Sequence, residues 1–517
     1  MKVVILVAVL IRLVLIPLPG NTSDIATFVR FADQVLDHGP QSLYDPADLG
    51  RVQGHFTYPP LFPMLLAGSL WIERDIAQLL RGTSLERVDA ISSEFDALVV
   101  KTWAVLGDAF LAWFAWREVH RSRGRRWAAV VVGAILCSPA IAYGGAYWGQ
   151  IDAMLAACVV AAVTSMLNRQ WMVVGAWMAV GMLLKPQMVV VMPVVGLGVM
   201  MIGRIEGVIR AGVGSVGAGA VLTAPFWITG RLGVLGSAYL HAAGAYPAVT
   251  VNADNAWTAL CAMPVGLTCG SDAELVISGL TYGQVGLLAL GACVTLVLVR
   301  LFPEFRLLGR IDRGSSVHLV REKRARAAIF LGTSISFLAF FMLPTQVHER
   351  YLLPGVALLA ISIANYRDAR VLYVIFSATL LANLLAVVPI SGGFAQQFLQ
   401  LGFNPQKIAW LNCVAFLRCI VLMAEADRII GSSNHSSNLQ LFIRYWAIPA
   451  AVSVGLISFI SVINYCSFMN VNESLIDWLI LTCAGNVVLR LMGWLVKFFK
   501  EVRSGRSVVL GVVSNES

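Results

Sequence analysis

Apolar residues recur along the chain in long runs that are separated by shorter polar stretches. Runs of about 15 to 25 apolar residues predict helices that cross a membrane, because such a helix spans the hydrocarbon layer and satisfies its own backbone polar groups. We predict an all-α polytopic membrane protein with about fourteen spans. They lie at residues 3–18, 98–117, 127–146, 151–167, 171–184, 187–202, 207–228, 278–302, 327–345, 351–365, 371–390, 408–424, 442–464 and 475–497.

The positive charges collect in a few of the loops between these runs. The 517 residues are 58% hydrophobic and 13% charged, with a formal net charge of +9. In a membrane protein an excess of Lys and Arg reports orientation, so we predict no nucleic-acid partner. The loops richest in arginine, 117–126 and 300–326, are predicted to be cytoplasmic, and both chain termini then lie on the cytoplasmic side.

One apolar run does not fit this topology. Residues 58–72 form a short run with three prolines among its first six residues. If the run crossed the membrane, the arginines of 117–126 would fall on the outer side and break the charge rule. We therefore predict an interfacial helix here, within a long first outer loop at residues 19–97. Ordered loops of such length are usually functional.

Polar residues that interrupt the apolar pattern fall on the outer side in this topology. They are Asp24 and the segments 147–152, 185–187, 252–257 and 348–350. The charged loops alone set the topology, so the convergence of these segments is informative. It predicts one outward-facing site at the membrane boundary.

Several of these residues have chemistry suited to group transfer. Asp24 could act as a general base on an acceptor hydroxyl, or it could cap the helix that begins beside it. Lys185 could present its ammonium to a lipid phosphate, with Gln187 as a further donor, or it could extend to the interface as a structural anchor. Arg350 offers a planar fork of donors suited to phosphate, and His348 can bond a phosphate or a sugar hydroxyl.

Other polar and aromatic residues are candidates for contacts with substrate. Trp148 and Gln150 could form a platform for a sugar ring or belong to an interfacial belt. Asp152 could bind substrate or cap the fourth span. Asp108 lies inside the second span together with Lys101, where each could be functional or could pair with a neighbouring helix.

Motifs for other chemistries are missing from the sequence. There is no P-loop, no dinucleotide-binding GxGxxG after a strand, no HExxH and no GxSxG. Clustered carboxylates that would require a metal are also missing, so we predict neither a cofactor nor a metal. Most of the nine cysteines lie in apolar runs, but Cys261 and Cys269 could approach each other on the outer side as one disulfide.

In this order, the motifs resemble the GT-C superfamily of polyprenyl-phosphate-sugar-dependent glycosyltransferases. The nearest likeness is to the dolichyl-phosphate-glucose glucosyltransferases of asparagine-linked glycan assembly and their bacterial relatives. The resemblance rests on Asp24, Tyr58 to Leu61, Asp108, Lys185 to Gln187, Asn255 to Trp257, and His348 to Arg350. It covers residues 1–390 as a GT-C-like module, whereas residues 391–517 hold C-terminal helices of unassigned role. One departure is that these glucosyltransferases typically have lysine where Arg350 stands.

The resemblance implies an inverting transfer of glucose or mannose from a polyprenyl-phosphate donor to a lipid-linked glycan or another acceptor. It implies that Asp24 is the catalytic base and that His348 lies beside the donor, with Lys185 and Arg350 at its phosphate. The predicted substrate-binding residues are His348, Arg350, Lys185, Gln187, Glu349, Tyr58, Trp148, Gln150, Asp152, Trp257 and Asp108.

We expect the site on the non-cytoplasmic face, in contact with membrane lipids, and favour a bacterial inner membrane over an endoplasmic reticulum. The alternative function is a polytopic transporter or lipid flippase, which would also explain many helices with polar interruptions.

Overall fold

The structure is a computed structural model, and nearly all the residues that it describes belong to helices. It describes residues 2–44, 58–81, 94–236, 239, 245–263, 269–277, 279–310, 316–389 and 404–431. The chain divides into two compact units, Met1–Ser432 and Ser433–Ser517, and every described residue lies in the first. The predicted spans at 442–464 and 475–497 lie outside the described residues.

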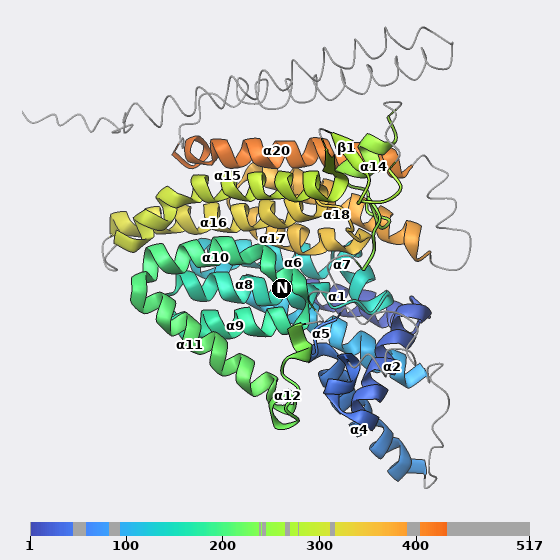
Figure 1. Ribbon diagram of the computed structural model, residues 1–517. Coiled ribbons are helices and arrows are strands. Elements are labelled where there is room, and N and C mark those ends of the chain that lie inside the picture. Colours follow the sequence, from blue (N-terminus) through green and yellow to red (C-terminus); the bar gives the residue numbers. More distant parts are fainter. Residues whose placement is uncertain are drawn as a thin grey trace, which may run out of the picture. The chain divides into compact units, whose positions relative to one another are not determined.

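The described residues of the first half of the chain form α-helices with short 3₁₀ and π-helical turns between some of them (Figure 1). In chain order they are α1 (Lys2–Leu15), α2 (Thr22–His38), the 3₁₀ helix η1 (Pro40–Tyr44), α4 (Leu61–Arg81), α5 (Glu94–Arg123), α6 (Arg125–Leu136), α7 (Pro139–Ala142), the π-helix η2 (Tyr143–Tyr147), α8 (Asp152–Leu167), α9 (Trp171–Leu184), η3 (Pro186–Val191), α10 (Met192–Gly198), η4 (Val199–Gly203), α11 (Arg204–Leu222) and α12 (Ala224–Ile228).

The second half contains first a short helix and a two-stranded hairpin, and then mostly long helices. In chain order its elements are α14 (Ala256–Cys261), β1 (Leu275–Ile277), β2 (Leu280–Thr281), α15 (Tyr282–Arg310), α16 (Ser316–Met342), the 3₁₀ helix η5 (Glu349–Leu352), α17 (Leu353–Ser362), α18 (Arg367–Val387) and α20 (Pro405–Gly431). The two strands pair as an antiparallel hairpin, and they are the only named strands of the described residues.

Six helical stretches of the described residues are long and apolar enough to cross a membrane, which indicates a membrane protein. They are Phe95–Arg123, Pro186–Leu222, Tyr282–Arg310, Leu319–Met342, Arg367–Val387 and Pro405–Ala426. A seventh candidate is the bent pair Arg125–Leu136 and Pro139–Tyr147, which turns by 48° at its break. Proline at the start of α7, with Ser138 as its cap, explains the break. The number of about fourteen spans stays a prediction.

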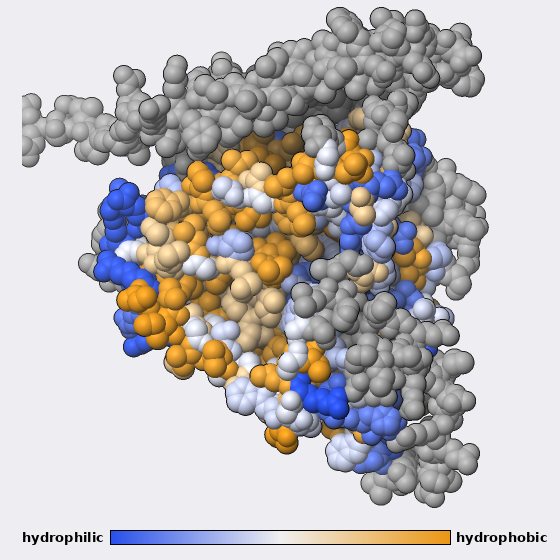
Figure 2. Space-filling model, viewed as in Figure 1, coloured by the Kyte–Doolittle hydropathy of each residue, from blue (hydrophilic) through white to orange (hydrophobic). Residues whose placement is uncertain are grey.

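Two helices occupy the centre of the described bundle. In α16, 94% of the most apolar 18-residue stretch is buried, and α8 buries nearly every residue that it contains. A helix that is apolar on all sides needs neighbours on all sides, which these two have. By contrast, α15 and α11 expose large apolar residues such as Leu287, Leu288 and Val216. Figure 2 shows this apolar surface over α10, α11 and α15, with hydrophilic side chains where α15 meets α16.

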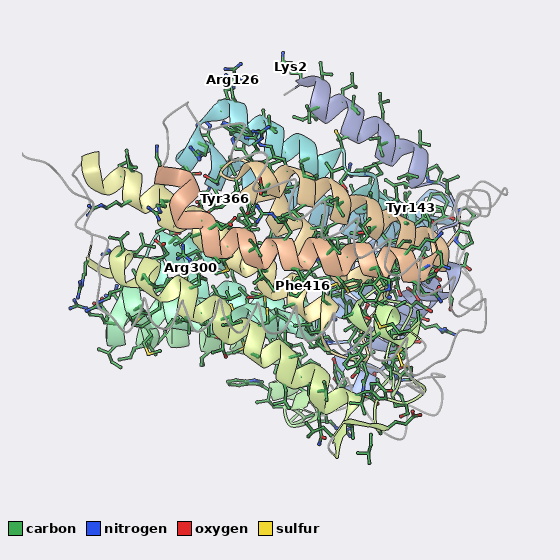
Figure 3. The ribbon with its side chains drawn as sticks, turned by 90° about the horizontal axis from the view of Figure 1, so that it is seen from above. Lys2, Arg126, Tyr143, Arg300, Tyr366 and Phe416 are labelled. Carbon is green, nitrogen blue, oxygen red and sulfur yellow. A yellow bond between two sulfur atoms is a disulfide. The ribbon has the colours of Figure 1, made fainter. Side chains whose placement is uncertain are left out.

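The helices run roughly along one axis, so the bundle has two ends. Figure 3 shows Arg126, Tyr366 and Arg300 toward one end and Tyr143 toward the other. We call the first the arginine end. The second, where η2 leads into the loop 148–151, we call the site end. At the site end α2 packs on α4, and the ring of Phe28 lies edge-on to Phe62 at 5.2 Å.

The helix predicted at 58–72 is longer in the structure, where α4 covers Leu61–Arg81. It is not among the candidate spans of the described residues. The longest candidate, Pro186–Leu222, contains a turn at Arg204, whose φ is 54°. Because α11 packs along α9 after this turn, the stretch contains two antiparallel arms and not one straight span.

Candidate active site

Asp24 lies in the first turn of α2, close to the helix N-terminus. The cap of this helix is Asn21, whose side chain accepts a hydrogen bond from the Asp24 backbone N–H at 3.1 Å. The alternative that Asp24 caps the helix is therefore wrong, because Asn21 has that role. The half-buried Asp24 carboxylate bonds instead to the loop that follows η2.

Two buried side chains of that loop hold the Asp24 carboxylate. Trp148 Nε1 donates to Asp24 Oδ2 at 2.8 Å, and Gln150 Nε2 donates to the same oxygen at 2.7 Å. Between them Gly149 has a φ of 88°, in the left-handed region that glycine adopts without strain. The second carboxylate oxygen, Oδ1, takes part in neither of these bonds.

Tyr58 connects this carboxylate to the cations of the site. Its hydroxyl donates to Gln150 Oε1 at 3.4 Å, and the centre of its ring lies 5.6 Å from Lys185 Nζ. The ring also packs edge-on against Phe28 of α2, with 5.4 Å between the centroids. Burial raises the pKa of the Tyr58 phenol, so the hydroxyl keeps its proton at neutral pH and acts as a donor.

Lys185 and Asp152 form a buried ion pair beside Tyr58. Lys185 Nζ lies 2.8 Å from Asp152 Oδ1, and the two side chains are 2% and 1% exposed. The pairing follows from the helical hairpin of α8 and α9, because α8 begins at Asp152 and α9 ends one residue before Lys185. Ile151 occupies the N-cap position of α8, so Asp152 is not the cap of this helix.

His348, Glu349 and Arg350 form the start of η5 at the same end of the bundle. Arg350 Nη1 lies 2.8 Å from Glu349 Oε1, and His348 Nδ1 lies 3.8 Å from Glu349 Oε2. The guanidinium carbon of Arg350 lies 6.0 Å from the ring centroid of Trp148. Trp148 therefore contacts both the arginine and the Asp24 carboxylate.

The pKa values of this segment depend on burial and on the neighbouring charges. For Glu349, burial raises the pKa, but the hydrogen bond with His348 and the charge of Arg350 outweigh burial, so the pKa lies below its usual range. For His348, burial together with the charges of Arg350 and Lys185 lowers the pKa and outweighs the interaction with Glu349, which raises it. His348 is therefore neutral at physiological pH and serves as a hydrogen-bonding group.

Side chains that are far apart in the sequence thus form one contiguous cluster. Asp24 reaches Arg350 through Trp148, and it reaches Lys185 through Gln150 and Tyr58. Each cation has a carboxylate partner, so the cluster has no excess of positive charge. It does contain buried polar atoms without a hydrogen-bond partner among the described residues, namely Asp152 Oδ2 and Arg350 Nε. Gln187 Oε1, two residues after Lys185, is also buried without such a partner, but no contact of Gln187 joins it to the cluster.

No family model matches the chain, and no curated protein is similar to it. The described residues contain no group of three or more His, Cys, Asp or Glu side chains placed to hold a metal ion.

The structure does not bring every candidate residue into the cluster. Asp108 pairs with Arg12 of α1, with Arg12 Nη2 2.7 Å from Asp108 Oδ2 and both side chains buried. Lys101 donates to the backbone carbonyls of Ile16 and Leu18, just beyond the end of α1. Lys101 and Asp108 of α5 therefore hold α1 and the residues that follow it, which is the structural alternative given for these two residues.

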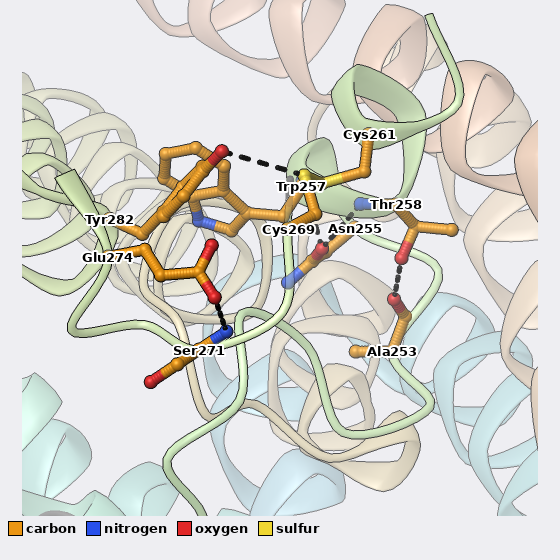
Figure 4. Close-up of a disulfide and its surroundings, with 9 residues drawn as sticks. All are labelled: Ala253, Asn255, Trp257, Thr258, Cys261, Cys269, Ser271, Glu274 and Tyr282. Carbon is orange, nitrogen blue, oxygen red and sulfur yellow. Dashed lines mark hydrogen bonds between the residues drawn. A yellow bond between two sulfur atoms is a disulfide. The ribbon is translucent and has the colours of Figure 1, made fainter. Parts of the chain in front are cut away.

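Trp257 belongs to a separate small core. Its ring packs edge-on against Tyr282 at 5.4 Å, and its Nε1 donates to the carbonyl of Leu343 at 2.7 Å. A disulfide between Cys261 and Cys269 closes this core, with Cys269 Sγ 3.8 Å from the Tyr282 hydroxyl (Figure 4). The sequence analysis gave this disulfide as a possibility, and the structure contains it.

Two further aromatic residues lie at the site and are not among the predicted substrate-binding residues. Tyr351 places its ring 5.7 Å from the Arg350 guanidinium carbon, and Tyr246 packs edge-on to His348 at 4.8 Å. Tyr351 directly follows the charged triplet, so its position was a usable signal. Tyr246 lies about 100 residues from His348, and nothing in its local sequence indicates the contact.

Proposed function

We propose that this protein is an inverting glycosyltransferase that moves a hexose from a polyprenyl-phosphate donor to an acceptor hydroxyl. The observation that carries the proposal is the contact of the Trp148 side chain with both Asp24 and Arg350, which puts a carboxylate and phosphate-binding donors in one cluster. A transfer from a sugar phosphate needs both groups, a base for the acceptor and donors for the leaving phosphate.

The geometry supports a division of labour within the cluster. Asp24 Oδ2 is held by two hydrogen bonds, which fix the orientation of the carboxylate while Oδ1 takes part in neither. Lys185 uses one of its N–H groups on Asp152, and Arg350 has a buried Nε–H with no partner among the described residues. These remaining donors suit the oxygens of a phosphate, to which arginine and lysine bond well.

The reaction then has a simple balance of bonds and protons. The acceptor oxygen forms a bond to the anomeric carbon while the bond from that carbon to the phosphate oxygen breaks. The hydroxyl proton passes to Asp24, and the electron pair of the broken bond goes to the phosphate, where Lys185 and Arg350 stabilise it. Attack opposite the leaving phosphate inverts the anomeric centre. His348, neutral at physiological pH, offers a hydrogen bond to the donor.

We further propose that this site faces the non-cytoplasmic side, because the loops at the opposite end carry the arginines. A bacterial inner membrane is the compartment that we favour. Glucose and mannose are the donor sugars to test first, with a lipid-linked glycan as the first acceptor.

The test is transfer by the purified protein in detergent with synthetic polyprenyl-phosphate-glucose and polyprenyl-phosphate-mannose. We expect Asp24→Asn to lower the rate by about 10² to 10⁴, the usual contribution of a general base, while thermal unfolding is unchanged. An asparagine oxygen can still accept from Trp148 and Gln150, so the loop keeps its anchor. Asp75→Asn, at an exposed position of α4, is the matched control and should keep full activity.

Two outcomes would count against this function. Full activity of folded Asp24→Asn would remove the base from the mechanism. Binding of the donor without any transfer, together with movement of the donor across reconstituted vesicles, would support the flippase alternative instead.

A further inference from the structure

One segment of the site end lies directly against His348. We call residues 245–255 the covering loop. Its Tyr246 packs edge-on to the His348 ring at 4.8 Å, and its Val251 N–H donates to the Val347 carbonyl at 3.1 Å. Val251 and Asn252 also form isolated bridges with His348. The position of His348 therefore depends on where the covering loop is held.

Two asparagines from long apolar helices hold this loop. Asn383 of α18 donates to the Asn252 carbonyl at 2.7 Å and accepts from the Asp254 N–H at 3.2 Å. Asn412 of α20 donates to the Asp254 carbonyl at 2.8 Å. Both asparagines are almost fully buried, at 3% and 1% exposure. The backbone around Asp254 is thus bound to both helices.

The Asp254 side chain has no comparable partner. It is 3% exposed, and its Oδ2 has no hydrogen-bond partner among the described residues. The Oδ1 of Asn412, on the residue that bonds the Asp254 backbone, is likewise buried and unpartnered. Both orphan atoms are acceptors when Asp254 is ionised, so the region has acceptors without a donor. An ionised carboxylate buried in this way is strongly disfavoured.

We propose that Asp254 holds a proton in the folded protein and that this neutral acid fastens the covering loop, making Asp254 a positioning residue for His348. The proton turns Asp254 Oδ2 from an acceptor into a donor. We infer that this donor forms a hydrogen bond to the unpartnered Oδ1 of Asn412. Loss of the proton leaves a buried charge and loosens the loop. The effect on catalysis rests on the proposed function, whereas the proton site itself does not.

The surroundings of Asp254 agree with a proton in place of an ion pair. Burial raises the pKa of Asp254 to about 7, with no charged neighbour among the causes. The ionisable groups on the elements that bond or flank the loop include Lys407, Arg418 and Glu425 on α20, Arg367, Asp368, Arg370 and Tyr373 toward the far end of α18, and His348, Glu349 and Arg350 beside the loop. Among the described residues none of these forms an ion pair with Asp254.

The sign of the pH dependence follows from this raised pKa. The closed loop binds the proton more tightly than the opened loop, where the pKa of Asp254 returns to its ordinary value near 4. Closure is therefore fully favoured below about pH 4, weakens as the pH rises toward 7, and changes no further above the pKa of the closed form. The opening constant should rise on the order of 10²-fold between pH 5 and pH 8.

Hydrogen exchange of residues 245–255, corrected for the chemical exchange rate, measures this opening directly. We expect the wild type to show the rise and Asp254→Asn to show almost none, because the asparagine amide supplies a donor at every pH. Asp75→Asn is the control with the same charge change at an exposed site, and it should follow the wild type. Because the loop opens as the pH rises, the transfer rate of the wild type should decline between pH 5 and pH 8. This decline should be absent in Asp254→Asn and present in Asp75→Asn.

The outcomes separate this proposal from the proposed function. If exchange depends on pH as stated but no transfer occurs with any donor, the proton site on Asp254 is supported and the proposed transferase function is rejected. If the wild type and Asp254→Asn exchange alike from pH 5 to pH 8, the proton site is wrong. Protection restored at pH 8 by sodium chloride but not by choline chloride would assign the site to a metal cation and overturn the proposal.

Discussion

The buried Arg326 of α16 and the half-buried Arg350 of η5 bind carboxylates at opposite ends of the bundle, but they differ in how completely they are bonded. At the arginine end, Arg326 forms two bonds to Glu118, at 2.8 and 2.6 Å, and further bonds to the Leu167 carbonyl and to Asn168. At the site end, Arg350 forms one bond to Glu349 at 2.8 Å and leaves its Nε buried without a partner among the described residues.

The difference indicates which pair is complete without a ligand. A buried polar group that lacks a partner costs free energy, so native proteins rarely keep one without a reason. The pair of Arg326 and Glu118 satisfies its donors within the protein and ties α5 to α16. The pairs at the site end leave Arg350 Nε and Asp152 Oδ2 unmatched, which is the state expected of a site that a ligand completes.

The largest effect should come from breaking the complete pair. Arg326→Leu leaves the Glu118 carboxylate buried without its cation, and we expect the free energy of unfolding to fall by about 3–5 kcal/mol. The specific activity of the protein that remains folded should hardly change, because Arg326 lies at the other end of the bundle. Thermal unfolding in detergent and transfer assays at low temperature would measure the two quantities.

Arg326→Leu combined with Glu118→Leu is the sharper control for that experiment. Removal of both charges should recover much of the lost stability, because the Glu118 carboxylate is then no longer buried without its cation. Glu322, the other carboxylate bound by Arg326, is 19% exposed and can be solvated by water. A double variant as unstable as Arg326→Leu alone would show that the pair matters through its packing and not through its charge. The comparison between the two ends would then lose its basis.

At the site end we expect a smaller effect, which is a loss of activity and not a loss of stability. Arg350→Lys keeps the positive charge beside Glu349 but loses the planar fork and the Nε donor, so transfer should fall by on the order of 10²-fold. The unfolding temperature should change little, because the ion pair can still form. A lysine variant with wild-type activity would show that only the charge is needed at this position.

The helical hairpin shows how much of the site could be predicted from the sequence. The bounds of the runs predicted at 151–167 and 171–184 agree closely with α8 and α9, although these two helices are shorter than the six candidate spans. The bounds already place Asp152 and Lys185 at neighbouring helix ends. Their ion pair could have been predicted from that geometry, since antiparallel helices of similar length bring these ends together. The pair itself is not among the predictions, in which Lys185 and Asp152 have separate roles.

Other features could not be predicted because they depend on contacts between distant segments. Arg12 lies in an apolar run, and only the packing of α1 against α6 and η2 brings its side chain to Asp108 of α5. The role of Asp24 as a cap was a fair alternative from its local sequence, and it failed because Asn21, three residues earlier, forms the bond. Local patterns identify helix ends, but they do not determine which side chains meet there.

The smallest effect tests how precisely the Asp24 carboxylate must be held. Gln150→Met removes one of its two donors while keeping a side chain of similar length, and Trp148→Phe removes the other. A hydrogen bond to a charged group contributes about 1.5–3 kcal/mol, so each variant should lower the transfer rate by about tenfold or somewhat more. Because both donors bond the same oxygen, the double variant should lose more than either single variant, and the loss should be in kcat with little change in KM for the donor. A loss confined to KM would mean that Trp148 and Gln150 bind the sugar and do not orient the base, and the site end would then be a binding surface around Arg350 and not a catalytic centre around Asp24.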